Sequence, residues 1–422
     1  MITKRTRFSI LLILLLPTLL IALITWISGP TNLVSSPLTQ MVASEIIAET
    51  TESNRQKFMI PGEATLAVGT NPLPLVWPVH RVENIYGFDS SGEKVKYIKG
   101  NDWEINNGII SRTVDSIIPD FTGYTYNTGT SCSISLFSKE CVRSILRCVL
   151  DMQIYQCVPS SNQSKFTFSA APRNPPLSIE YNIYVDYETL INSETTVATP
   201  TKRADLTPFE SVLCLGDSIT AGSHTVEHYY NNEDSDSWCG LLRDTFKSHA
   251  QFKNISLPGG HVDYLSRNME KFVSKRADIA IVSVGMNDHL RGIEWAADFE
   301  EQLLEVATKF KKNGTQTIFI GFFQQNILWR KENTAASVLF NKAISNAALN
   351  SNSIFVDISS IFRAAYPEDF SSIIWTADFM HHPNNFGHKV YASAILPYLL
   401  TDAHPRSNIP YYVPINTIPK YR

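Results

Sequence analysis

The sequence predicts an α/β protein with two domains: a doubly wound parallel-sheet domain over residues 209–404, preceded by a β-sandwich or jelly-roll-like domain over residues 61–197. Two observations carry this prediction. In the second half of the chain, short apolar runs alternate with helical patterns, as they do in βαβ units. In the first half, short runs with a period of two are broken by Gly, Asn, Asp and Pro, and no long helical pattern interrupts them.

The individual elements follow from these patterns. Residues 297–312 place an apolar side chain every three or four positions and stop before Gly314, which predicts an amphipathic helix. Residues 179–185 alternate apolar and polar side chains, which predicts a half-buried strand. The other expected strands are 94–98, 108–111, 165–169, 212–215, 279–284, 316–322 and 353–356, and the other expected helices are 335–349 and 388–400.

The N-terminal segment predicts export. Lys4, Arg5 and Arg7 precede an almost unbroken apolar stretch over residues 8–27, about the length that spans a bilayer as a helix. Residues 1–28 are therefore a signal anchor or a signal peptide, and the length of the run and the poor cleavage site favour the anchor. The rest of the chain is then extracytoplasmic and membrane-tethered, or secreted or periplasmic if the segment is cleaved. Residues 29–60 form the expected tether, and residues 405–422 are a tail without an assigned role.

Length, hydrophobic content and net charge indicate a globular protein and give no sign of nucleic-acid binding. A chain of 422 residues suits two domains, and a hydrophobic content of 44% predicts a sizeable core. The formal net charge of −4 gives no indication of nucleic-acid binding.

The clustered cysteines predict a disulfide if the chain is exported, with four separate thiols as the alternative. Cys132, Cys141, Cys148 and Cys157 cluster in one short segment, and in an exported chain they predict at least one disulfide. Cys214 lies in an expected strand and is interpreted as a small core residue.

The candidate nucleophile is Ser218. The apolar run 212–215 stops at Gly216, so Ser218 follows the carboxyl end of a buried strand, where open α/β sheets place their ligands. A serine there needs a base that takes its proton. The string from Gly216 to Thr220, Gly-Asp-Ser-Ile-Thr, resembles the first block of the SGNH (GDSL-type) hydrolases.

Two later blocks strengthen this resemblance. Asn254 is followed five residues later by Gly259, as in the second block, and residues 282–288 form an apolar strand that ends in Gly-Met-Asn-Asp, as in the third. The resemblance implies an oxyanion hole built from Ser218, Gly259 and Asn287. Taken alone, the Pro-Gly-Gly string at 258–260 indicates only a turn, and Asn287 only a helix N-cap.

The last block contains the candidate base. The family signature is Asp-x-x-His with Pro after the His, but here Asp378 and His381 have that spacing while His382 precedes the Pro. We favour His382 as the base, because the His-Pro-Asn-x-x-Gly-His register from His382 onwards is intact. Asp378 is then expected to orient the imidazole and stabilise the imidazolium.

A competing metal motif is present at His224-Thr-Val-Glu-His228, the His-x-x-Glu-His pattern of one class of zinc enzymes. That pattern requires a helix and a third ligand, and here it falls in a loop-like stretch. We therefore expect both histidines at the rim of the pocket or on the surface, with no metal and no cofactor.

The resemblance implies a serine esterase that forms an acyl-enzyme on Ser218. A β domain in front of the hydrolase domain resembles the two-domain carbohydrate esterases, so removal of O-acyl groups, foremost O-acetyl, from a carbohydrate is the first expectation. O-acyl transfer to a polysaccharide and lipase or thioesterase activity are alternatives. A polysaccharide-binding protein with a decayed site is the non-enzymatic alternative, and the displaced His-His-Pro register favours it.

Overall fold

The computed structural model describes residues 55–120, 178–192, 209–325, 333–365 and 374–400. All of them belong to one compact unit of the chain. Several predicted features lie outside these residues: the anchor or signal peptide, most of the tether, the strand at 165–169, the cysteines from Cys132 to Cys157 and the C-terminal tail. Within them, no helix is long and apolar enough to cross a membrane.

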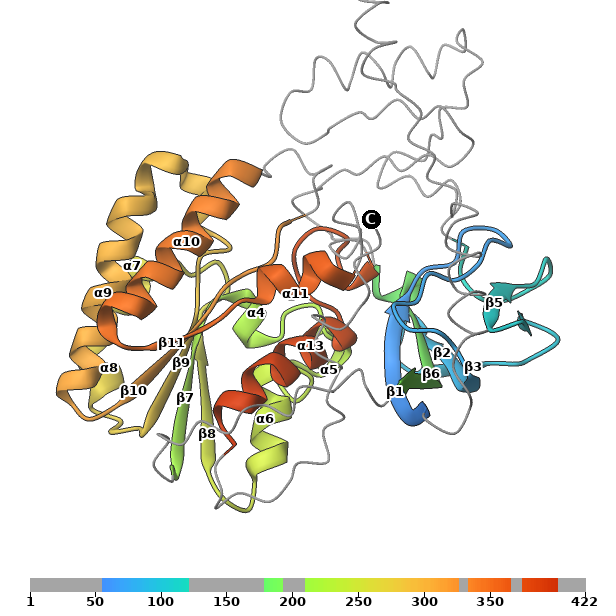
Figure 1. The fold of residues 1–422 in the computed structure, drawn as a ribbon, viewed down its shortest axis with the longest axis horizontal. Helices are drawn as coiled ribbons and strands as arrows, with labels where there is room; N and C mark the ends of the chain where they lie inside the picture. The colour runs from blue at the N-terminus through green and yellow to red at the C-terminus, as the bar shows by residue number, and fades with distance from the viewer. Residues whose placement is uncertain (1–54, 121–177, 193–208, 326–332, 366–373, 401–422) are drawn as a thin grey trace, which may run out of the picture. The chain divides into compact units, whose positions relative to one another are not determined.

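The second half of the chain forms a five-stranded parallel sheet in the order β11-β10-β9-β7-β8. The chain enters at the inner strand β7, adds β8 on one side, and then crosses over β7 to continue outward from β9 (Figure 1). This order confirms the doubly wound arrangement, and its switch point lies between β7 and β9, where ligands bind in such sheets. The strands are β7 Ser211–Gly216, β8 Gln251–Ser256, β9 Ile279–Ser283, β10 Gln316–Ile320 and β11 Ile354–Val356.

Helices cover both faces of this sheet. Figure 1 shows α9 and α10 on one face and α6 and α13 on the other. In α9 the predicted apolar stripe is buried, from Phe299 to Phe310, because it faces the sheet. The helices are α4 Ser218–Ala221, α5 Val226–Asn231, α6 Trp238–Phe246, α7 Val262–Arg267, α8 Met269–Val273, α9 Ala296–Lys312, α10 Thr334–Ser351, α11 Ile358–Ala365 and α13 Asn385–Ile395, with short 3₁₀ turns η3 Asp288–Arg291, η4 Ile293–Trp295 and η6 Leu396–Tyr398.

The N-terminal part is a β region, as predicted. A four-stranded antiparallel sheet has the order β1-β6-β2-β3, and β4 and β5 form a separate hairpin pair. The sandwich or jelly-roll arrangement stays a prediction, because residues 121–177 are not described. The elements are β1 Arg55–Thr65, β2 Arg81–Phe88, β3 Lys94–Tyr97, β4 Trp103–Asn106, β5 Ile109–Arg112, η2 Ser178–Tyr181 and β6 Ile183–Asn192.

Two sequence expectations in this region differ from the structure. Residues 55–60 were expected in the tether, yet they open strand β1, where they pair with β6. The strand expected from residue 179 begins only at Ile183, because residues 178–181 form the 3₁₀ turn η2. Alternating side chains suit either conformation over so short a stretch, and pairing with β1 and β2 starts the strand.

Cys214 is not a simple core residue, which corrects the sequence interpretation. It is buried as expected, but it forms a disulfide with Cys239 of α6, with the Cα atoms 6.2 Å apart. The bond ties the strand that leads to Ser218 to the helix that packs beside it. The sequence did not indicate this pair, because the packing of α6 on β7 brings together cysteines 25 positions apart.

The β region contacts the helix that follows the candidate base. Lys389 Nζ in α13 donates to the carbonyl of Pro61 in β1 at 3.1 Å. The Asn384 side chain, which caps α13, donates to the side-chain oxygen of the buried Asn182 at 2.9 Å. These contacts join the β region to the segment that carries His382.

Candidate active site

Ser218 stands at the first turn of α4, directly after β7. Gly216 ends the strand where a Cβ atom would collide with the Thr220 side chain and the Ser283 carbonyl, so only glycine fits there. Asp217 caps α4, and its Oδ1 accepts the backbone N–H of Ile219 at 2.9 Å. Strand and cap therefore hold Ser218 at the carboxyl edge of the sheet, where it is buried with 7% of its surface exposed.

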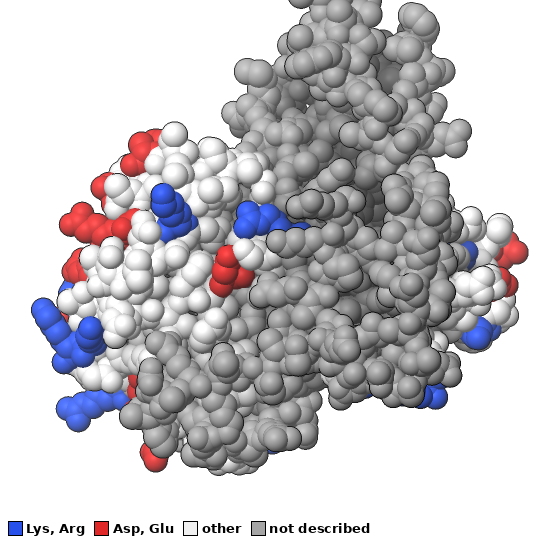
Figure 2. Space-filling view, viewed as in Figure 1, with Lys and Arg blue, Asp and Glu red and all other residues white. Residues whose placement is uncertain are grey.

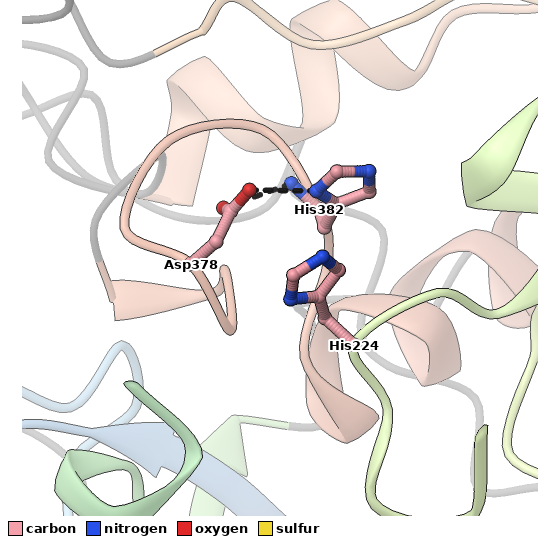
Figure 3. Close-up of side chains that lie close together, drawn as sticks. All are labelled: His224, Asp378 and His382. Carbon is pink, nitrogen blue, oxygen red and sulfur yellow. Dashed lines mark hydrogen bonds and ion pairs between the residues drawn. The ribbon is translucent and has the colours of Figure 1, made fainter. Parts of the chain in front are cut away.

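Asp378, His382 and Ser218 form a continuous hydrogen-bonded chain. His382 Nδ1 lies 2.6 Å from Asp378 Oδ2, and His382 Nε2 lies 2.9 Å from Ser218 Oγ. Figure 3 shows the Asp378 carboxylate directed at the His382 ring. The structure thus brings together the nucleophile, base and orienting acid that the sequence predicted, with His382 and not His381 beside Ser218.

A turn around Asp378 accommodates the extra residue between the acid and the His-Pro pair. Oδ1 of Asp378 accepts the backbone N–H groups of Met380, His381 and His382 at 2.9, 2.9 and 3.1 Å. Phe379 inside the turn has a left-handed φ of 56°. This wrapping carries the backbone far enough for the fourth residue after the acid to reach Oδ2, while His381 Nδ1 stays 3.7 Å away from that oxygen.

The expected oxyanion donors line the same edge of the sheet. Gly259 has a left-handed φ of 73°, open space where a Cβ would stand, and a backbone N–H that bonds to no residue in the described part of the chain. The Asn287 amide donates to the Gly260 carbonyl at 3.1 Å, which leaves its second N–H for another acceptor. Asn287 occupies the N-cap position of η3, as its alternative interpretation expected, but its side chain makes no capping hydrogen bond there.

Asn254 connects β8 to the segment that carries Ser218. Its side-chain amide donates to the Thr220 carbonyl at 2.7 Å and to Asp234 Oδ2 at 2.9 Å. It therefore ties β8 to the helix that begins with Ser218.

The electrostatics suit proton transfer at neutral pH. Burial lowers the pKa of His382, so the imidazole is neutral and able to accept a proton. Burial alone raises the pKa of Asp378, but attraction to the protonated forms of His382 and His381, together with the hydrogen bond from His382, outweighs burial and holds that pKa well below its usual value. Burial raises the pKa of Asp217 to about 7.

The His-x-x-Glu-His motif does not form a helical metal site. Thr225 caps α5, so His224 lies outside the helix that carries His228. Donor atoms of His224, Asp378 and His382 do lie within 4.8 Å of one another. However, the rings of His224 and His382 are stacked with their planes at 19°, so their nitrogen lone pairs run side by side instead of converging. This geometry fits a hydrogen-bonded chain of side chains better than a set of metal ligands.

Sequence reasoning expected His224 at the pocket rim or on the surface, and it missed a ring contact that this residue makes there. Its ring lies on the face of the His382 ring, with centroids 4.3 Å apart (Figure 3). The motif that singled out His224 was the available signal, but it suggested a ligand and not a ring contact.

The face drawn in Figure 2 carries charged side chains of both signs among the described residues. No single sign of charge dominates that face. This agrees with the small net charge of −4.

The match to a protein family agrees with the site. Residues 214–390 match the GDSL-like Lipase/Acylhydrolase family. A search of curated proteins found no match. Among solved structures, the chain is similar to LAE5, an alpha/beta hydrolase from the metagenome of Lake Arreo in Spain, at 18% identity, a TM-score of 0.38, and coverage of 46% of this chain and 97% of that one.

Two further similar structures are acetylxylan esterases. A catalytic mutant of Axe2 from Geobacillus stearothermophilus has 18% identity and a TM-score of 0.38, and the match covers 47% of this chain and 97% of that one. The acetyl xylan esterase AlAXEase has 19% identity and a TM-score of 0.38, with coverage of 45% and 100%. The family match spans the segment from the strand before Ser218 to the helix after His382. The chain is therefore an ester hydrolase with a GDSL-like lipase/acylhydrolase domain over residues 214–390.

Proposed function

We propose that this protein is an extracytoplasmic serine esterase that removes O-acyl groups, foremost O-acetyl, from a carbohydrate. The observation that carries the proposal is the chain of hydrogen bonds from Asp378 through His382 to Ser218. A hydroxyl becomes a useful nucleophile only beside a base, and this base is itself oriented by a buried carboxylate.

In the proposed reaction, Ser218 Oγ attacks the ester carbonyl and gives its proton to His382 Nε2. The carbonyl oxygen becomes negative and receives hydrogen bonds from the Ser218 and Gly259 N–H groups and the free N–H of Asn287. The intermediate then expels the alcohol, which takes the proton from Nε2. Water next attacks the acyl-enzyme, His382 accepts its proton, and the carboxylic acid leaves as Ser218 is regenerated.

The extracytoplasmic location rests on two features. The apolar stretch after Lys4, Arg5 and Arg7 is long enough to span a bilayer. The disulfide between Cys214 and Cys239 is of a kind that persists in oxidising compartments. We propose that residues 1–28 anchor the chain, with export in soluble form as the outcome if the segment is cleaved.

The proposal of a carbohydrate substrate is based on the arrangement of the β region and the hydrolase domain. A β region precedes the hydrolase domain, as in the two-domain carbohydrate esterases that the sequence resembles. In this chain the β region contacts α13 through Lys389 and Asn384, next to the segment that carries His382. An extended substrate bound by the β region would therefore lie near the reacting residues.

The test uses the full chain with p-nitrophenyl acetate, butyrate and octanoate, and with acetylated glycans. We expect the highest kcat/KM with acetate, release of acetic acid from a glycan, and loss of activity on the order of 10³-fold or more in Ser218→Ala. Preference for octanoate would indicate a lipase, and transfer of acetyl to an added glycan would indicate a transferase. Either result, or full activity of the Ser218→Ala variant, would overturn the proposal.

A further inference from the structure

The ring of His224 lies face to face with the ring of His382. The two centroids are 4.3 Å apart and the planes are inclined by 19°, whereas the neighbouring His381 ring is tilted by 40° to that of His382. His382 uses its two nitrogens, both in the ring plane, for Asp378 and Ser218. The His224 ring, stacked on the face of the His382 ring, therefore restricts rotation of the His382 ring out of the plane that contains Asp378 and Ser218. It does so without competing for either hydrogen bond of His382.

The backbone holds His224 in this position at a cost. His224 has a left-handed φ of 70°, which costs a non-glycine residue about 1 kcal/mol or more. The flanking turn maintains it: the Ser223 N–H donates to the Ser218 carbonyl at 2.9 Å, and the Thr225 N–H and hydroxyl both donate to the Gly222 carbonyl. The turn begins at the nucleophile itself, so the stacked ring is positioned relative to Ser218.

Several charged or titratable groups face this ring pair. Asp378 and His381 come from the loop that carries His382, His228 comes from α5 and His388 from α13. Asp378 favours the charged form of both rings of the pair, while a charge on His228 disfavours it. His388 stays neutral, because burial lowers its pKa to about 3.

Within the pair, a charge on His224 opposes protonation of His382. Burial lowers the pKa of each ring, and the charge of His224 lowers that of His382 further. Two imidazolium rings stacked at this distance repel strongly. A proton taken up by His224 therefore leaves His382 in the neutral form that accepts the proton of Ser218.

We propose that His224 is a positioning residue for the base: its stacked ring holds His382 in line between Asp378 and Ser218, and once protonated it delays protonation of His382 as the pH falls. The inference rests on the proposed function, in which His382 is the general base. It implies an esterase that keeps its activity further into the acid range than its base alone would allow.

Two variants separate the two effects. His224→Asn tolerates the left-handed backbone but removes the ring and its charge. His224→Phe keeps a ring for stacking but removes the charge. His80→Phe, at an exposed histidine of the β region, is the matched control, and Ser218→Ala reports on the proposed function itself.

The measurement is kcat and kcat/KM of the full chain on p-nitrophenyl acetate across the pH range, with thermal unfolding as the check on folding. The fall of kcat/KM at acid pH, called the acid limb, reports the pKa of the general base in the free enzyme. We expect both His224 variants to move this limb to higher pH by about one unit. His224→Asn should also lower the plateau kcat by about tenfold with KM little changed, while His224→Phe and His80→Phe keep it.

An unchanged acid limb in His224→Phe, or an unchanged plateau kcat in His224→Asn, would overturn this inference. If Ser218→Ala is inactive while the His224 variants behave like the wild type, this inference alone fails. If Ser218→Ala remains active, the proposed function fails, and the role of His224 fails with it.

Discussion

Replacing Asp378 tests how the candidate base is oriented, because the two oxygens of its carboxylate have different partners. Oδ1 accepts three backbone N–H groups of the loop, and Oδ2 accepts His382 Nδ1 at 2.6 Å. An Asn with its oxygen at the Oδ1 position keeps the loop but turns an NH₂ group towards Nδ1. Nδ1 must then act as acceptor, so the ring proton moves to Nε2, where it faces Ser218 Oγ and prevents proton uptake.

We expect Asp378→Asn to fold like the wild type and to lose kcat by about 10⁴-fold, which corresponds to about 5 kcal/mol of transition-state stabilisation. Asp378→Ala also removes the acceptor of the three N–H groups. Each orphaned donor costs about 1–3 kcal/mol when it stays buried. The Ala variant should therefore be at least about 3 kcal/mol less stable than the Asn variant.

Initial rates on p-nitrophenyl acetate measure the first effect, and urea unfolding followed by tryptophan fluorescence measures the second. His381→Ala is the control, because its Nδ1 lies 3.7 Å from Asp378 Oδ2 and its ring does not bridge Asp378 to Ser218. An Asn variant within tenfold of wild-type kcat would refute the orienting role. Equal stability of the Asn and Ala variants would refute the role of Oδ1 in the loop.

Three further predictions concern the oxyanion hole, the disulfide and a buried carboxylate. Asn287→Ala should lower kcat by about 10²–10³-fold at nearly constant KM, because its free N–H bonds most strongly to the oxyanion; steady-state kinetics in which only KM rises would contradict this. Replacing both Cys214 and Cys239 by Ala should lower the free energy of unfolding by about 3 kcal/mol, the entropy of closing a loop of 25 residues, and urea curves that coincide with the wild type would be the opposing result. Burial raises the pKa of Asp217 from 3.8 to about 7, so the stability that this group contributes at low pH is lost as the pH rises between these values. Asp217→Asn should therefore exceed the wild type in unfolding free energy by about 4 kcal/mol at about pH 8 but not at about pH 4, and an equal gain at both pH values would show that ionisation is not the cause.

The α/β core and the residues gathered at its edge could be predicted from the sequence. Strands and the amphipathic helices are local patterns of side chains, so the strand before Ser218 and the helix over residues 296–312 could be predicted without tertiary information. Parallel strands end at one edge of a sheet. Motifs that follow different strands, such as those of Ser218 and Asn287, were therefore expected to meet there.

Contacts between segments that are far apart in the sequence became known only from the tertiary structure. The order of residues from Asp378 to His382 left two histidines as candidates, and only the turn around Asp378 placed His382 beside Ser218. The same holds for the disulfide, which required α6 to pack on β7, and for His224, whose motif indicated a ligand while a left-handed turn made it a stacking partner. Sequence patterns report which face of an element is apolar, whereas contacts between individual rings, thiols and carboxylates arise only when turns and packing fix those elements against each other.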